Sequence, residues 1–163
     1  MPEFSQQEQN VFYNSRPKKR IAAMVWLEDN TGKLLIAKPT YKKGWTLIGG
    51  GVDENESPLD AAVRETREEI GILLDKTRFE FIGYRYVEPR DGRSEDSQVF
   101  FRARLTPNEI EAIKLQAEEL SEHVFVTPAD LPTYADTPRM QAVMAIAHHE
   151  RYPFYMVNET CIL

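Results

Sequence analysis

The chain of 163 residues carries 20 lysines and arginines against 26 aspartates and glutamates, which gives a net charge of −6. With 42% hydrophobic and 28% charged residues, its composition is typical of a globular protein and argues against disordered, fibrous and membrane classes. The acidic balance has the wrong sign for a protein that binds duplex nucleic acid through its phosphates.

Residues 1–163 are expected to form one domain, because this length suits a single compact unit. Residues 1–15 are expected to be a loose N-terminal tail, and the basic run at 16–20 a solvated approach to the first strand. The N-terminus lacks the features of a secretory signal, and no apolar run approaches the ~18 residues of a membrane span. We therefore expect a cytoplasmic protein without a membrane partner.

Two apolar, β-prone runs open the domain. Residues 20–27 (RIAAMVWL) and 34–37 (LLIA) flank a turn-rich segment at 28–32, and this pattern predicts a β-hairpin. After a loop, the short apolar piece at 45–48 stops at three consecutive glycines.

A helix follows the glycines. Ser57 is suited to the N-cap, Pro58 to the first helical position and Gly71 to the C-terminal stop, so the helix is predicted to span 58–70. Its apolar face is expected to carry the residues Leu59, Ala62, Val63, Thr66 and Ile70.

The rest of the chain alternates between strands and a late helix. Runs at 79–87 and 99–105 predict two strands, and the charged loop between them, 88–96, is placed to border a binding site. A further strand is predicted at 123–126. Thr137 and Pro138 then predict the start of a second helix. Strands before, between and after helices indicate an α/β or α+β domain.

Three glutamates of the first helix form an acidic strip. Glu65, Glu68 and Glu69 are related by steps of three and four residues, so their side chains converge beside the core face. Each like-charge pair costs an isolated helix roughly 0.2–0.5 kcal/mol. A divalent cation such as Mg²⁺ or Mn²⁺ would reverse this repulsion, and Arg64 can orient a carboxylate by a hydrogen bond. The alternative interpretation is an ordinary solvated helix face.

The wider pattern favours the metal site. The segment fits G-x5-E-x7-R-E-U-x-E-E-x-G-U, where U is a bulky apolar residue, and this pattern resembles the signature of the Nudix hydrolases. It is carried by Gly50, Glu56, Arg64, Glu65, Glu68, Glu69, Gly71 and Ile72. Two positions depart from the family pattern: Thr66 replaces a bulky apolar residue, and Ile48 stands where many members have proline.

The resemblance implies a Nudix-type α/β/α sandwich with a mixed β-sheet over residues 20–149. It also implies cleavage of the P–O–P bridge of a nucleoside diphosphate linked to another moiety, with Mg²⁺ or Mn²⁺ as cofactor. The expected partner is a small nucleotide, and a homodimer is compatible with the family. Thr66 is expected to alter packing and to leave the chemistry unchanged.

The resemblance also implies roles for individual residues. Glu65, Glu68, Glu69 and the carbonyl of Gly49 are expected to bind metal, with Gly50 and Glu56 supporting the site. The catalytic residues are expected to be Glu65, Glu68 and Arg64. The general base is either Glu65 or a glutamate from a later loop, for which the candidates are Glu118, Glu119 and Glu122. We favour Glu119, which is also the expected late metal ligand.

Substrate contacts are expected from a set of basic and aromatic residues, chiefly Lys38, Trp45, Arg85 and Arg90. An alternative function is a non-catalytic nucleotide sensor that uses the same fold. Such sensors commonly lose a metal-binding glutamate, whereas all three glutamates are present in this chain. The sequence therefore favours the enzyme.

Overall fold

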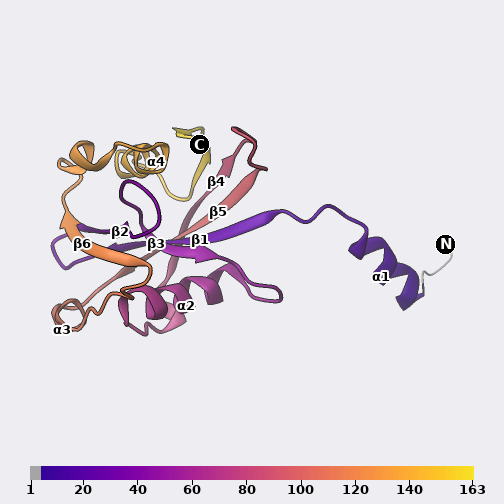
Figure 1. The fold of residues 1–163 in the computed structure, drawn as a ribbon, viewed down its shortest axis with the longest axis horizontal. Coiled ribbons are helices and arrows are strands. Elements are labelled where there is room, and N and C mark those ends of the chain that lie inside the picture. The colour runs from indigo at the N-terminus through magenta and orange to yellow at the C-terminus, as the bar shows by residue number, and fades with distance from the viewer. Residues whose placement is uncertain (1–4) are drawn as a thin grey trace.

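The computed structural model describes residues 5–163 and shows a mixed, eight-stranded β-sheet with helices on both faces (Figure 1). The order across the sheet is β6-β2-β1-β5-β4-β7-β8, and β3 pairs with β1. The strands are β1 (Arg20–Glu28), β2 (Leu34–Pro39), β3 (Ile48–Gly51), β4 (Glu80–Val87), β5 (Asp96–Arg104), β6 (Leu120–Val126), β7 (Phe154–Val157) and β8 (Thr160–Cys161). The α-helices are α1 (Gln6–Asn14), α2 (Pro58–Ile70), α3 (Pro107–Glu111) and α4 (Pro138–Ala147), and short 3₁₀ turns span Lys76–Arg78 and Leu131–Tyr134.

Two apolar layers, one on each face of the sheet, form the core. Successive side chains of a strand point to opposite faces, so Met24 and Trp26 lie in the layer that contains the buried side chains of α4. Ala23 and Val25 lie in the layer that contains those of α2. Figure 1 shows α2 and α4 on opposite sides of the sheet, which confirms the predicted α/β/α sandwich. In the described part of the chain, no helix has the length and apolarity that crossing a membrane requires.

Strand β1 divides one of its edges between two partners. Its first half pairs with β3, from Ala22 opposite Gly51 to Val25 opposite Ile48, whereas its last residue, Glu28, pairs with β2. The predicted hairpin of β1 and β2 is therefore antiparallel but paired only beside its turn. This division places the glycines of β3 within the sheet, directly beside β1.

Two parts of the chain contain elements that the sequence pattern did not predict. Beyond residue 149, β7 joins the sheet parallel to β4, and β8 pairs with β7. Between β5 and β6, α3 follows Thr106, which caps it by accepting from the Glu109 N–H at 3.3 Å.

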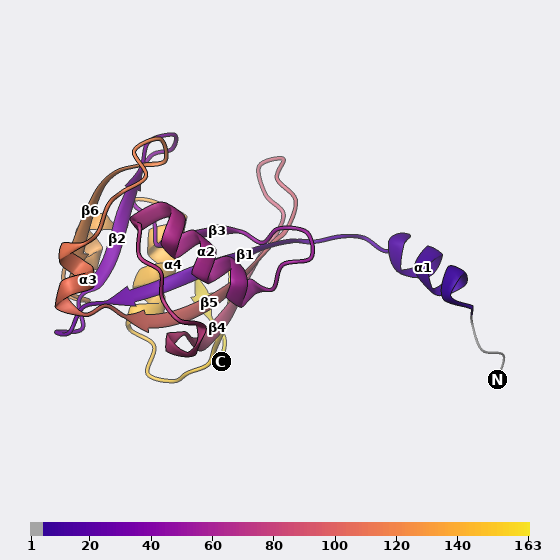
Figure 2. The ribbon, with the colours of Figure 1, turned by 90° about the horizontal axis from the view of Figure 1, so that it is seen from below.

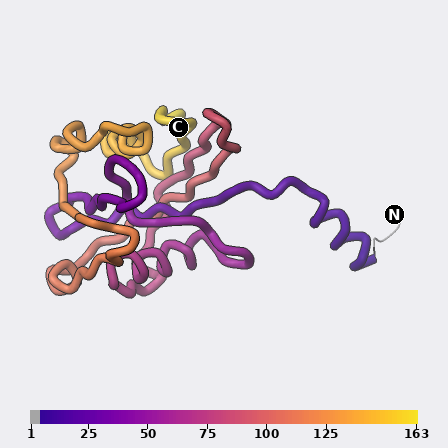
Figure 3. Tube along the Cα trace, in the orientation of Figure 1, coloured from indigo at the N-terminus to yellow at the C-terminus, as the bar shows by residue number. Residues whose placement is uncertain are grey.

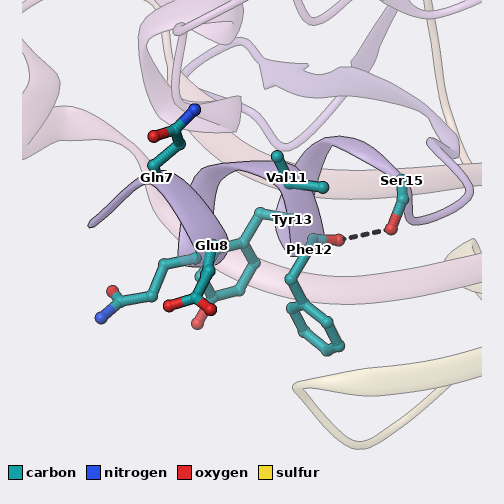
Figure 4. A pocket seen from close by; sticks show the side chains of 7 residues that line it. Gln7, Glu8, Val11, Phe12, Tyr13 and Ser15 are labelled. Atoms are coloured by element: carbon teal, nitrogen blue, oxygen red, sulfur yellow. Dashed lines mark hydrogen bonds between the residues drawn. The ribbon is translucent and has the colours of Figure 1, made fainter. Parts of the chain in front are cut away.

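Part of the segment that we expected to be a loose tail forms α1. The Ser5 hydroxyl accepts from the Glu8 N–H at 3.3 Å, and the Glu8 carboxylate accepts from the Ser5 N–H at 2.9 Å. No residue of α1 is buried, and the helix stands apart from the sheet beyond an extended connection (Figure 1, Figure 2 and Figure 3). Figure 4 shows a surface hollow lined by side chains of α1 and by its C-cap Ser15, including the exposed Val11 and Phe12.

A charged pair fastens α3 to the rest of the domain. The Arg78 guanidinium donates to the two oxygens of Glu109 at 2.5 and 3.0 Å, and it also donates to the carbonyl of Arg104. The Arg78 hydrogen bonds are the main reason that the pKa of Glu109 is lowered to about 2. Both side chains are partly shielded from solvent, so this pair is more stabilising than an exposed one.

We predict that Glu109→Gln lowers the free energy of unfolding by about 1–2 kcal/mol at pH 7, as expected for a charged hydrogen bond at a partly exposed position. Because folding depresses this pKa, the contribution is present above pH 4.5 and is lost as the pH falls toward 2. Denaturant unfolding at pH 7 and pH 3 should show the difference between parent and variant narrowing at pH 3. Glu111→Gln, at an exposed position of the same helix, is the control. A difference independent of pH would contradict this account.

Candidate active site

Helix α2 carries the acidic strip, and its two ends are those that the sequence predicts. Ser57 Oγ accepts from the Asp60 N–H at 3.1 Å, and Pro58 is the first helical residue. Gly71 follows the helix in the left-handed conformation, with φ of 75°. Figure 2 shows that α2 runs alongside β3. Two of its glutamates, Glu65 and Glu69, approach the glycines of that strand.

The buried face of α2 differs slightly from the predicted one. Ala62 and Thr66 are buried as expected, and Thr66 Oγ1 donates to the Ala62 carbonyl at 2.7 Å. Thr66 therefore fits the core with its hydroxyl satisfied. Leu59 and Val63 are only half-buried, and Glu69 is buried in their place. The helix is turned so that part of its acidic strip faces the sheet.

Glu69 is an unusual residue because its carboxylate is placed inside the protein. The residue is 6% exposed, and its Oε2 accepts the Gly49 N–H at 2.8 Å. Burial raises the pKa of Glu69 to about 8; the Gly49 hydrogen bond opposes this shift, and the charges of Glu65 and Glu119 add to it. This buried carboxylate has one hydrogen-bond donor and two acidic neighbours, and no lysine or arginine of the described residues forms a salt bridge with it.

Glu65 lies against the backbone of Gly50. A Cβ atom on Gly50 would stand 2.4 Å from Glu65 Oε1, so only glycine leaves room for this carboxylate. The side chain of Glu65 is 12% exposed, and burial raises its pKa while the Arg64 hydrogen bond lowers it. The glycine turn therefore allows two α2 carboxylates to approach β3 closely.

Arg64 organises the carboxylates around it. Its Nε and Nη2 donate to the two oxygens of Glu56, each at 2.9 Å, and Nη2 also donates to the Gly51 carbonyl at 2.9 Å. Its Nη1 donates to Glu65 at 2.7 Å and to Glu68 at 3.1 Å. The paired Arg64 hydrogen bonds are the main cause of the lowered pKa of Glu56. Arg64 thus ties the loop before α2 to two of the predicted metal ligands.

Glu119 is the late-loop glutamate that the fold brings to this site. The Gln116 N–H donates to the Glu69 carbonyl at 3.0 Å, which holds the segment before β6 against the end of α2. Glu119 is half-buried, and its charge acts on Glu69, whereas Glu118 and Glu122 are exposed. The role of Glu119 as metal ligand or general base stays a prediction, and its position on the segment held against the end of α2 suits that role.

The donors of this site fit a hard divalent cation. They are carboxylate oxygens together with the backbone of a glycine turn, which are the ligands that Mg²⁺ and Mn²⁺ prefer. Within residues 5–163 no three acidic, histidine or cysteine side chains already converge on one metal position. Hydrogen bonds to Arg64 and to the Gly49 N–H engage Glu65, Glu68 and Glu69 in this arrangement. A bound cation would replace these hydrogen-bond donors as the partner of the carboxylate oxygens.

Two of the predicted substrate-binding residues lie near the β2–β3 connection. Lys38 is exposed, and its Nζ stands 3.7 Å from the Glu122 carboxylate. Trp45 is half-buried and meets Tyr134 edge to face, with 5.2 Å between the ring centroids. Trp45 also packs against the core layer of α4, so structural packing accounts for much of its surface.

The other two predicted contacts, Arg85 and Arg90, lie elsewhere and are joined through Glu159. Arg85 is buried: its Nε donates to the Asn158 carbonyl at 2.5 Å, and its Nη2 donates to Glu159 at 3.3 Å. Arg90 is exposed and donates to the same Glu159 oxygen at 2.8 Å. The Arg85 guanidinium is therefore largely engaged within the protein.

Arg85 and Arg90 line a cavity of about 680 Å³ between the β4–β5 loop and the start of α4. We call it the arginine cavity, because five arginines line it: Arg20, Arg85, Arg90, Arg93 and Arg139. Arg20 and Arg139 were absent from the predicted substrate contacts. A local signal existed for Arg139, since a cation in the first turn of a helix is unfavourable for the helix dipole.

Similarities to known proteins agree with this geometry. The family model described as the NUDIX domain matches residues 18–145. An RNA pyrophosphohydrolase of Nitratiruptor sp. is 28% identical over 134 residues, covering 73% of this chain and 83% of the relative. The nucleoside triphosphatase NudI of Escherichia coli is 31% identical over 117 residues, covering 66% of this chain and 82% of the relative.

Solved structures show the same fold. The NUDIX domain of Shewanella oneidensis NrtR, complexed with ADP ribose, has a TM-score of 0.70 at 18% identity and covers 88% of this chain and 97% of that chain. A C. elegans Ap4A hydrolase in a binary complex has a TM-score of 0.61 at 24% identity and covers 78% of this chain and 93% of that chain. At these identities the likeness concerns the fold alone.

We predict that Gly50→Ala weakens Mn²⁺ binding by about 10–100-fold, the usual cost of disturbing the groups that orient metal ligands. The new Cβ would meet the end of the flexible Glu65 side chain, so the carboxylate moves and the backbone stays. Gly51→Ala is the matched control, because nothing lies within 4 Å of its new Cβ. Calorimetric titration with Mn²⁺ measures the affinities, and circular dichroism checks the fold. Equal affinities for the two variants would refute the proposed role of Gly50.

In the absence of metal, we predict that the parent protein loses stability as the pH rises from about 5 to about 8. Folding raises the pKa of Glu69 to about 8, so the folded state binds a proton that the unfolded chain releases above its ordinary value of 4.5. Glu69→Gln should flatten this dependence. Thermal unfolding in EDTA across this pH range tests the prediction, and parallel curves for parent and variant would contradict it.

Proposed function

Since the chain belongs to the Nudix family of hydrolases, we propose that it is a metal-dependent pyrophosphohydrolase acting on a nucleoside diphosphate linked to another moiety. The observation that carries this proposal is the buried carboxylate of Glu69, with Glu65 and Glu119 nearby and no cationic partner in contact. An arrangement of this kind is stable only if the carboxylates are protonated or neutralised by a cation.

In this proposal Glu65, Glu68, Glu69 and the Gly49 carbonyl hold Mg²⁺ or Mn²⁺. A divalent cation at this position supplies positive charge that polarises phosphoryl oxygens and offsets the charge of a pyrophosphate. Such help is required in a protein of net charge −6, because a polyanion binds only where the local potential is inverted.

The chain's own residues supply orientation and proton transfer. Arg64 fixes the directions of Glu65 and Glu68 through hydrogen bonds of 2.7 and 3.1 Å. Glu65 and Glu119 are the candidates to accept the proton of the attacking water, whose oxygen bonds to phosphorus while the bridging P–O bond breaks. Burial raises the pKa of Glu65, which makes this carboxylate a stronger proton acceptor than a fully solvated one. Glu119 forms no side-chain hydrogen bond within the described residues, which leaves its oxygens available.

The relatives suggest which substrates to test first. Among them are an RNA pyrophosphohydrolase and a nucleoside triphosphatase, and the structural neighbours include an Ap4A hydrolase and a domain complexed with ADP ribose. The substrates and ligands in these names contain a nucleotide with adjoining phosphates. A metal site beside basic groups would accept this class of molecule. We therefore propose a nucleotide of this class as the substrate.

We predict that Glu69→Gln lowers kcat in saturating Mg²⁺ by about 100-fold or more, the order found for loss of a key electrostatic group in an active site. Glu118→Gln, at an exposed position, should retain parental turnover. The assay is a hydrolysis panel that spans nucleoside triphosphates, ADP-ribose, nucleotide sugars and dinucleoside polyphosphates, with products identified. Full activity of Glu69→Gln would overturn the assignment. Nucleotide binding by the parent without hydrolysis of any substrate would favour the sensor.

A further inference from the structure

The arginine cavity is electropositive within an acidic protein. Its lining contains five arginines and three acidic residues, Glu88, Asp91 and Asp96, which leaves a surplus of two positive charges. The chain as a whole has a net charge of −6. Cations gathered in a concave surface of such a protein create a local potential that attracts anions.

Among the described residues, two of these arginines have no acidic partner. Arg85 and Arg90 share Glu159, and Arg20 stands 3.9 Å from Asp96. By contrast, the side chains of Arg93 and Arg139 form no hydrogen bond or salt bridge within the part of the chain that the structure describes. Arg139 is half-buried, so its guanidinium has lost part of its hydration without gaining an acceptor.

The start of α4 adds to the positive potential. Thr137 and Pro138, the N-cap and first residue of the helix, both line the cavity. The N-terminus of a helix is its positive end, so Arg139 in the first turn is repelled by the helix dipole. A bound anion would offset both the repulsion and the lost hydration of Arg139. A cation would do the same for the carboxylates of α2.

Two segments of the chain run from the carboxylate site toward the arginine cavity. Arg20 begins β1, two residues before Ala22, and Ala22 pairs with Gly51 in the glycine turn. The β2–β3 connection also reaches the start of α4, because a Cβ on Gly44 would lie 2.5 Å from Thr137 Cγ2. Arg20 of the cavity thus lies on the strand that pairs with the glycine turn. The β2–β3 connection lies against the start of α4.

Lys42 in this loop is influenced by both sites. Desolvation of its ammonium group, together with the charge of Arg139, lowers the pKa of Lys42 to about 8, and the charge of Glu69 opposes this shift. Lys42 is therefore close enough to Arg139 and to Glu69 for both charges to act on it.

We propose that the arginine cavity binds a phosphate group of the substrate other than those joined by the bond that is cleaved. This inference rests on the proposed function and specifies its substrate class: nucleosides with an extended polyphosphate chain are preferred over nucleotides joined to an uncharged sugar. Arginine suits this task, because its planar guanidinium donates two parallel hydrogen bonds to phosphate. The cavity volume of about 680 Å³ suits a small ligand.

The test compares two substrates that share one nucleoside: the triphosphate and the diphosphate joined to an uncharged hexose. The double variant Arg93→Gln/Arg139→Gln should raise KM for the triphosphate by about 10-fold or more, as expected for losing a charge-assisted hydrogen bond. Its kcat should stay within about threefold, and KM for the hexose compound within about twofold. Arg151→Gln, an exposed arginine outside the cavity, is the control.

A second measurement separates this inference from the proposed function. Tripolyphosphate is titrated calorimetrically into the full chain in EDTA, with Tm confirming that each variant is folded. Binding by the parent and its loss in the double variant support the cavity even if no substrate is hydrolysed. Absence of tripolyphosphate binding by the parent overturns the inference, as do equal KM changes for both substrates. Glutamine at Arg139 removes a cation from the positive end of a helix, so the variant should fold.

Discussion

The close approach of α2 carboxylates to the glycine turn of β3 is the contact on which the rest of the site depends. A Cβ on Gly49 would stand 2.1 Å from the Ala23 carbonyl oxygen, and one on Gly50 would collide with Glu65. Because both positions lack side chains, β3 lies tightly beside β1 and still leaves space for two acidic groups. Glu69 then enters the protein and is held by the Gly49 N–H.

Burying like charges together would destabilise the helix unless other groups compensated for them. Arg64 supplies much of this compensation, since it donates to Glu56, Glu65, Glu68 and the Gly51 carbonyl at once. It does not reach Glu69, whose only donor among the described residues is a backbone N–H. The arrangement is therefore a partly balanced cluster, and a divalent cation is the partner that would complete it.

The α4 side of the sheet has the opposite polarity. There the arginines without an acidic partner are those beside the first turn of α4. In the proposed function, a nucleotide with several phosphates and a divalent cation would neutralise both groups of charges. Such complementarity would give the acidic chain a way to bind a polyanion without an excess of basic residues over its whole surface.

The sequence by itself determined the acidic helix, its caps and the spacing of Glu56, Arg64, Glu65, Glu68 and Glu69, because these features depend on contacts within one helix and the loop before it. Its strand and helix patterns also indicated an α/β or α+β domain, and the resemblance to the Nudix signature implied the sandwich. Only the tertiary structure decided that Glu119, rather than Glu118 or Glu122, is the late-loop glutamate whose charge acts on Glu69, and that Arg20 and Arg139 share a cavity with Arg85. Those neighbours are far apart along the chain, and no local periodicity encodes where a loop or a strand end will meet another. The energy of such contacts arises only when the sheet brings separate segments together.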